Sequence, residues 1–341
     1  MKIVFVHFGK RTPKHLELNI ERCLSLFPDI PVILITDKAC KVPAIGGLET
    51  FYYTPDSKWH VIDKALSHPK DFRENFWLTS LTRFLAIENY LMVNPNEILH
   101  VESDVILAKD FPFDRFTTLT KPVAFPVLSP TQGIASTLYF RNYESAQALV
   151  KISLEMVSAD SQTTDMLILR RFYDLNPGLI QALPIGPDEL DIYRPTMSSE
   201  LMKDMAIGAK HLHGFFDGLD FGYFIYGVDP RNQRGRRVVR KAIQTNFLQV
   251  EKTVLNFSKS RDFLSITSQN DGAELPIYSL HIHSKNPSIF NLRKSANNLR
   301  RGAEAYQQPP SSKLVAKVFL SSVLASIIRR MKGFKKNRSI M

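Results

Sequence analysis

The sequence predicts an α/β fold in which a mostly parallel central sheet is flanked by helices. Strand-like apolar runs alternate with helical patterns through the first half of the chain, which is typical of βαβ units. In addition, 44% of the 341 residues are hydrophobic and 11% are aromatic. This composition is enough for a substantial core and is ordinary for a soluble α/β enzyme.

The expected elements follow one another in chain order. Strands are expected at residues 2–8, 31–37, 50–53, 98–107, 123–127, 134–140, 179–185 and 276–283. Helices are expected from Pro13 onward and at residues 74–92, 143–157 and 163–174. The helix at 74–92 has the longest apolar pattern, and Arg83 lies among its apolar positions.

The most informative segment is Ile98-Leu-His-Val-Glu-Ser-Asp-Val-Ile-Leu107. Residues two apart on a strand project to the same side, so Glu102 and Asp104 are expected to converge. Two adjacent carboxylates repel each other and lose hydration, and a divalent cation that carries a diphosphate would offset this cost. The alternative is a loop at the end of the strand whose acids face water.

A second set of polar residues ends the last expected strand, in Leu280-His-Ile-His-Ser-Lys285. Either His281 or His283 could complete a coordination sphere begun by Asp104, and His283 lies nearer the strand end. Lys285 could place a charge on a phosphate. A mixed carboxylate and imidazole set favours Mn²⁺ somewhat over Mg²⁺. A purely structural histidine pair is the alternative.

Two further segments each allow two interpretations. Asp165 lies in the first turn of an expected helix, where the helix dipole favours an acid, but it could also face a sugar or an acceptor hydroxyl. The aromatic segment 215–232 contains Asp217 and Asp220. It suits carbohydrate recognition, or it is a buried aromatic segment with turns at its glycines.

The positive charge of the chain is concentrated at its C-terminal end. Residues 291–341 hold 12 Lys and Arg and one acid, which leaves 32 bases (44 − 12) and 32 acids (33 − 1) elsewhere. Residues 307–312 have linker composition, and 313–341 read as a basic amphipathic helix too short in its apolar part to span a bilayer. We expect this tail to bind an anionic membrane surface. No nucleic acid is expected, because the remainder is neutral and lacks a recognition motif.

Taken together, these residues resemble bacterial glycosyltransferases of the GT-A type. In that family a Rossmann-like sheet binds a nucleotide-sugar, and a D-x-D motif holds a metal against the diphosphate. Asp104 matches the last carboxylate of the motif, and Glu102 stands where the family has Asp. Arg83 matches a helix arginine that contacts the donor, and His-Ile-His-Ser-Lys285 resembles a late metal-binding histidine followed by a phosphate-contacting lysine. The resemblance spans about residues 1–290.

The resemblance implies a glycosyltransferase domain over residues 1–306. It would move a sugar from a nucleotide-diphosphate donor to a glycan or lipid-linked acceptor in bacterial surface-polysaccharide synthesis. The residues assigned to the metal, Mn²⁺ or Mg²⁺, are Asp104, Glu102, His283 and His281. Those assigned to the donor are Arg83, Lys285 and Asp37, and Asp165 is the candidate catalytic carboxylate.

The expected location is the inner face of the cytoplasmic membrane, in line with the presence of only two cysteines. Two alternatives to a glycosyltransferase remain. A nucleotidyltransferase would carry a glycine-rich basic loop after the first strand, of which residues 7–13 are a faint version. A membrane-surface adaptor would use the tail alone, with the acids solvated.

Overall fold

The computed structural model describes residues 1–69, 75–187, 197–227, 248–250, 253–268 and 272–307, and its strands form two sheets. The main sheet contains β1 (Lys2–Val6), β2 (Val32–Thr36), β3 (Leu48–Tyr52), β4 (Ile98–Val101), β6 (Val123–Ser129), β7 (Gln132–Gly133), β8 (Thr137–Phe140) and β9 (Ile180–Leu183). The second sheet contains β5 (Val105–Leu107), β10 (Phe215–Phe216), β11 (Val254–Ser258), β12 (Phe263–Thr267) and β13 (Glu274–His281). The helices are α1 (Lys14–Leu26), α2 (Ser57–Ala65), α3 (Phe76–Val93), α4 (Phe113–Thr117), α5 (Tyr143–Ala159), α6 (Asp165–Leu175), α7 (Ser199–Leu212), α8 (Asp220–Tyr226), α9 (Pro287–Phe290) and α10 (Leu292–Gln307).

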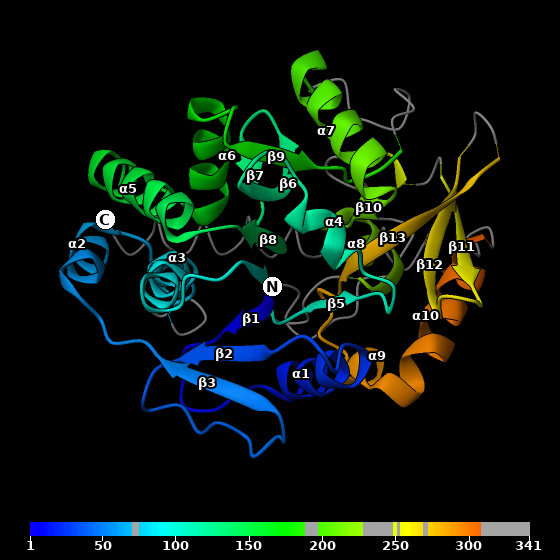
Figure 1. Ribbon diagram of the computed structural model, residues 1–341, viewed down its shortest axis with the longest axis horizontal. Helices are drawn as coiled ribbons and strands as arrows, with labels where there is room; N and C mark the ends of the chain where they lie inside the picture. Colours follow the sequence, from blue (N-terminus) through cyan, green and yellow to red (C-terminus); the bar gives the residue numbers. More distant parts are fainter. Residues whose placement is uncertain (70–74, 188–196, 228–247, 251–252, 269–271, 308–341) are drawn as a thin grey trace, which may run out of the picture.

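The main sheet runs in the order β3-β2-β1-β4-β8-β6-β7, with β9 beside β6 (Figure 1). Strands β3, β2, β1 and β4 are parallel to one another, as are β6 and β9, whereas β8 is antiparallel to both of its neighbours. The predicted α/β fold with a mostly parallel sheet is therefore confirmed. Because the carboxyl ends of parallel strands meet at one edge, the loops after β1, β2 and β4 lie together.

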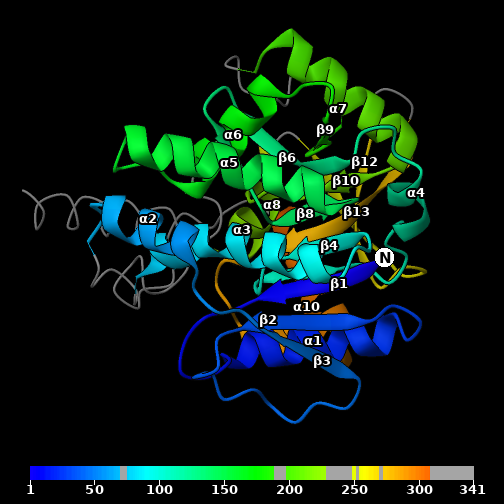
Figure 2. The ribbon, with the colours of Figure 1, turned by 60° about the vertical axis from the view of Figure 1, so that its left-hand side comes forward.

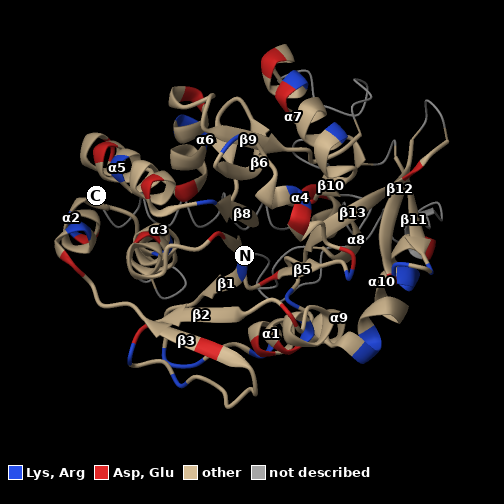
Figure 3. Cartoon of the chain, in the orientation of Figure 1, with Lys and Arg blue, Asp and Glu red and all other residues tan. Residues whose placement is uncertain are grey.

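Strands β1, β2 and β4 bury residues on both of their faces and are mostly apolar, whereas the edge strand β3 is partly exposed and contains Glu49. Alternate residues of β1 and β2 belong to different cores: Val4 and Ile33 pack in the core that contains α3, and Ile3 and Val32 pack in the core that contains α1. Helices α1 and α3 accordingly lie on opposite sides of the sheet, and α5 lies beside α3 (Figures 1 and 2). Strand β2 carries no charged residue, and charges gather on helices and loops (Figure 3).

The prediction of a single strand over residues 98–107 is wrong. Strand β4 ends at Val101, the chain turns, and β5 begins at Val105 in the second sheet, where it pairs with β13. The turn closes with a hydrogen bond from the Val105 N–H to the Glu102 carbonyl (3.0 Å). Three polar residues in succession (Glu-Ser-Asp) interrupt the apolar run and favour a turn over a continued buried strand.

Other boundaries also shift. The last strand ends at His281, so His283 lies beyond it, and α10 includes Gln307, which was expected to begin the linker. Helix α7 and strands β11 and β12 were not predicted. The basic tail, residues 313–341, lies outside the described residues. No helix among those that the structure describes has the length and apolarity needed to cross a membrane.

Candidate active site

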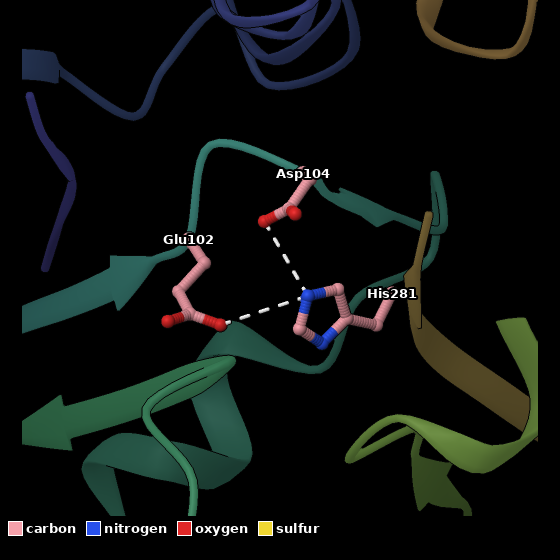
Figure 4. A group of neighbouring side chains, drawn as sticks. All are labelled: Glu102, Asp104 and His281. Atoms are coloured by element: carbon pink, nitrogen blue, oxygen red, sulfur yellow. Dashed lines mark ion pairs between the residues drawn. The ribbon is translucent and has the colours of Figure 1, made fainter. Parts of the chain in front are cut away.

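The turn after β4 brings Glu102 and Asp104 to the carboxyl edge of the parallel strands. The Glu102 N–H donates to the carbonyl of Ser136 (3.1 Å), the residue before β8, which fixes the start of the turn. Both carboxylates face the ring of His281 across the turn, although they no longer belong to one strand (Figure 4). Asp104 is 7% exposed, and the Glu102 side chain is 18% exposed. The predicted convergence is confirmed, and the turn produces it.

Helix α1 braces this turn from the other side. The Asn19 side-chain amide donates to the Val105 carbonyl (2.6 Å) and to the Ser103 carbonyl (3.3 Å), and His15 Nε2 lies 3.3 Å from Ser103 Oγ. Neither residue was predicted from the sequence to lie at the site. Their signal is two polar side chains four apart on the apolar face of an amphipathic helix, where burial requires polar partners.

The third residue, His281, reaches the turn from the end of β13, opposite Val105 of β5. Its Nδ1 lies 2.9 Å from the Gly218 carbonyl, which can only accept, so Nδ1 carries the proton. Its Nε2 is therefore directed toward the acids, 3.4 Å from Asp104 Oδ1 and 3.8 Å from Glu102 Oε2 (Figure 4).

The charged side chains in this group lie close enough to shift the pKa values of His281 and Asp104. Burial favours the neutral form of His281, but the charge of Asp104 outweighs it and raises the pKa of His281 to about 9. Burial likewise opposes ionisation of Asp104, yet Lys285 and His281 hold its pKa well below its usual value. In the metal-free protein the imidazolium and the ammonium thus supply the positive charge that the acids need.

The donor atoms of Glu102, Asp104 and His281 lie within 4.8 Å of one another. Octahedral ligands at 2.0–2.1 Å from a hard divalent cation lie roughly 3 Å apart when adjacent and roughly 4 Å apart when opposite, and the separations of 3.4 and 3.8 Å from His281 Nε2 lie between these values. A histidine whose Nδ1–H is held by a backbone carbonyl is the usual arrangement of a metal-binding imidazole. These residues therefore fit a divalent cation of the manganese or magnesium class.

His283 lies next to this group without joining it. Its ring stacks on the ring of His281, with centroids 3.9 Å apart and planes 20° apart. Burial and His281 together lower the pKa of His283, so the ring is neutral at pH 7. Its buried Nε2 has no hydrogen-bond partner among the described residues. The structure thus brings both predicted histidines to the site and directs His281 toward the carboxylates.

Arg83 joins two of the predicted acids. It reaches the site from α3 and donates to Glu102 through Nη1 and to Asp165 Oδ2 through Nη2 (2.7 Å). Burial alone would lower the pKa of Arg83, but the two carboxylates raise it. Burial raises the pKa of Asp165 against the effect of Arg83. Because Asp165 is the first residue of α6, the pair connects α3, α6 and the turn after β4.

The remaining predicted residues occupy two different environments. Lys285 follows β13 with a φ of 49°, and its ammonium pairs with Asp104 Oδ2. Asp37 follows β2, on the same sheet edge, and its oxygens accept the N–H groups of Gly9 (3.1 Å) and Ala39 (2.8 Å). Lys285 is thus part of the charged group, whereas Asp37 braces two loops beside it.

Most of the described part of the aromatic segment is buried, which favours the interpretation of a buried segment with turns at its glycines over carbohydrate recognition. Phe216 and Phe221 are fully buried, and Asp217 and Asp220 are 1% and 3% exposed. Both acids accept backbone N–H groups, since Asp217 binds those of α8 and Asp220 binds that of Leu248 (2.8 Å). Residues 228–232 lie outside the described residues.

Comparisons with known proteins give only distant likenesses. No family model matches the chain, and no curated protein matches it in sequence. Solved structures that match include the galactosyltransferase LgtC in complex with donor and acceptor sugar analogues, at a TM-score of 0.40 and 11% identity over 54% of this chain and 73% of that one. The PaToxG glycosyltransferase matches at 0.35 and 9% identity over 62% and 76% of the two chains. Mouse xyloside xylosyltransferase 1 in its apo form matches at 0.34 and 10% over 54% and 84%. At these TM-scores, we base the assignment below on the geometry of this chain's own residues.

Proposed function

We propose that the chain is a metal-dependent glycosyltransferase of the GT-A type, which moves a sugar from a nucleotide-diphosphate donor to an acceptor hydroxyl. The observation that carries the proposal is the group formed by Glu102, Asp104 and His281 at the carboxyl edge of the parallel strands. In open α/β sheets, ligands bind at this edge. Two carboxylates and one imidazole supply the ligands that a cation needs to hold a diphosphate.

Glu102, Asp104 and His281 would hold Mn²⁺ or Mg²⁺, which when bound supplies positive charge to the departing diphosphate. Lys285 lies on the flank of the group, where its ammonium can pass from Asp104 to a phosphate oxygen. The ring of His283 is neutral, and its Nε2 has no hydrogen-bond partner among the described residues, so His283 is the alternative candidate for the imidazole ligand of the cation. Arg83 holds Glu102 in place through a charge-assisted hydrogen bond.

Asp165 is our candidate for the carboxylate that positions the sugar or activates the acceptor. It is buried beside the group, and its pairing with Arg83 fixes its orientation. A raised pKa would favour proton transfer with an acceptor hydroxyl near neutral pH. Asp37 would contribute to donor binding by shaping the loops after β1 and β2.

The biological setting extends this proposal. We infer a glycan or lipid-linked acceptor in bacterial surface-polysaccharide synthesis. The charge concentration supports a peripheral position on the inner face of the cytoplasmic membrane, since the 12 bases and one acid of residues 291–341 suit an anionic leaflet. The domain boundary near residue 306 and the linker at 307–312 are inferred from the Pro- and Ser-containing composition of this segment, of which Gln307 lies in α10.

Calorimetric titration of UDP and GDP, with and without Mn²⁺, tests the function. We expect Mn²⁺-dependent binding of one nucleotide, and at least about a 100-fold loss in D104N, because removal of a direct ligand should exceed the roughly 10- to 100-fold effect of outer-shell changes. D204N is the matched control. Asp204 pairs with Lys121 (2.7 Å), and its side chain is 12% exposed, against 10% for Asp104.

If neither nucleotide binds, CMP and dTDP are titrated in the same way. Failure of all four nucleotides in the presence of Mn²⁺ would refute the assignment. Equal loss in D104N and D204N would show that the effect comes from general destabilisation of the fold.

A further inference from the structure

We propose that Asp217 is a positioning residue that sets the main chain and the ring of His281 for metal binding. The proposal rests on the proposed function, because it takes His281 as a ligand. Asp217 follows β10, and the segment from it to Gly222 lies against the end of β13, where His281 stands. No pattern in the sequence assigns this role to Asp217.

The Asp217 carboxylate joins the end of one strand to the start of a helix. Its Oδ1 accepts the Phe221 N–H (3.0 Å), and its Oδ2 accepts the N–H groups of Gly222 (2.8 Å) and His281 (3.1 Å). Its own N–H donates to the Ser279 carbonyl (3.1 Å). Asp217 is therefore tied to the end of β13 at two points, through its N–H at the Ser279 carbonyl and through its carboxylate at the His281 N–H.

The next residue fixes the imidazole itself. Since the Gly218 carbonyl accepts the Nδ1–H of His281, any shift of residue 217 moves the group that decides which nitrogen faces the acids. Asp217 thus controls the ligand through one bond to its main chain and through the adjacent carbonyl that holds its ring. Hydrogen bonds from neighbouring groups to a metal ligand orient that ligand in many metal sites.

Helix α8 packs tightly against the end of β13 at Gly222. A Cβ placed on Gly222 would lie 1.7 Å from the His281 carbonyl oxygen and 3.1 Å from Asp217 Oδ2. Helix α8 therefore approaches the strand end as closely as a backbone can, which only glycine permits. The three acceptor contacts of Asp217 are all to backbone N–H groups, so the carboxylate is engaged in holding the chain and leaves coordination to Glu102 and Asp104.

The test compares D217N with D220N by Mn²⁺ titration followed by electron paramagnetic resonance. Asp220 is the matched control, because it is a buried acid of α8 that also accepts a backbone N–H, that of Leu248. Asn keeps only one accepting oxygen in place of two. We expect D217N to lose roughly 10- to 100-fold in Mn²⁺ affinity, whereas D220N changes it less than about threefold, with a comparable fall in melting temperature for both.

A second readout needs no metal. In ¹⁵N-histidine NMR spectra of the metal-free protein, the Nδ1 proton of His281 should be protected from exchange by Gly218. It is assigned by its absence from H281Q. We expect this resonance to be lost or shifted in D217N and kept in D220N. D217S, which retains one acceptor and leaves room for water, serves if D217N does not fold.

Unchanged Mn²⁺ affinity together with an unchanged Nδ1 proton in D217N would overturn the proposal, as would equal effects in D220N. If the wild-type protein binds no Mn²⁺, the proposed function fails, and the NMR comparison still decides whether Asp217 positions His281.

Discussion

Two acids follow the strands on either side of β1, and they have different kinds of partner. Asp37 follows β2 and gives both of its oxygens to backbone N–H groups of the adjoining loops. Asp104 follows the end of β4 and faces a lysine and a histidine. Because the partners of Asp37 are backbone N–H groups, its carboxylate holds the adjoining loops and is not open to exchange with a cation. Side-chain cations can be replaced by another cation, so Asp104 can exchange its partners for a ligand.

The largest expected effect comes from breaking the charged group at Arg83. R83M leaves Glu102 and Asp165 without their shared cation in a buried site, which should destabilise the protein by about 3–5 kcal/mol. Urea unfolding of the wild type and the variant measures this free energy directly. The double variant R83M/D165N should recover part of the loss.

R300M is the control for R83M, because Arg300 and Glu304 form an exposed pair whose side chains are 49% and 63% exposed. Its expected cost is below about 1 kcal/mol. Similar costs for R83M and R300M would show that burial does not strengthen the charged group around Arg83.

The second-largest expected effect is that of pH on the free energy of unfolding. His281 titrates near 9 in the metal-free fold and near 6.5 when unfolded. A raised folded pKa contributes stability that is fully present below pH 6.5 and is lost as the pH rises toward 9, on the order of 3 kcal/mol. Unfolding free energies at pH 6 and pH 9 check this, and the pH slope over this window should be smaller in H281Q.

Mn²⁺ affinity should follow the opposite trend, because the cation needs the neutral imidazole. It should rise between pH 6 and pH 8, with release of a proton that calorimetry in buffers of different ionisation enthalpy detects. A proton-independent affinity would mean that His281 is not a ligand.

The smallest effect is expected at Asp37. D37N keeps one accepting oxygen and loses one of the two hydrogen bonds, at a cost of about 1 kcal/mol. Nucleotide affinity, measured in the titration proposed above, should change less than about threefold. A large loss of nucleotide binding without any loss of stability would instead show that Asp37 contacts the donor directly.

The sequence was sufficient for the parallel half of the fold. Strands β1 and β2 are uninterrupted apolar runs that end at polar residues, and α1 and α3 have long apolar faces, so local pattern and tertiary burial agree. In the second sheet only β13 was predicted as a separate strand. Strands β11 and β12 each contain a polar residue, Asn256 and Ser265, which interrupts the apolar pattern. Strands β5 and β10 pair with β13 from distant parts of the chain, and such pairing leaves little local signal.

The candidate site likewise contains residues that were predicted from the sequence and residues that were not. Glu102, Asp104 and His281 were named because acids and imidazoles interrupting apolar runs are conspicuous. The roles of Asn19, Asp217 and Gly218 could not be found in this way, since each acts through a backbone contact to a residue far along the chain. Asp37 and Asp104 also look alike in sequence, and only the identity of their partners separates them.

The turn that carries Glu102 and Asp104 also has a topological consequence. It is the first point at which the chain passes from the main sheet to the second sheet, and His281 belongs to the latter. A cation held between Asp104 and His281 would act as a cross-link that closes a loop of 177 residues (281 − 104). Cross-links across long loops restrict the unfolded chain most. Metal affinity would therefore report completion of the whole fold, because no fragment that lacks either sheet contains the binding site.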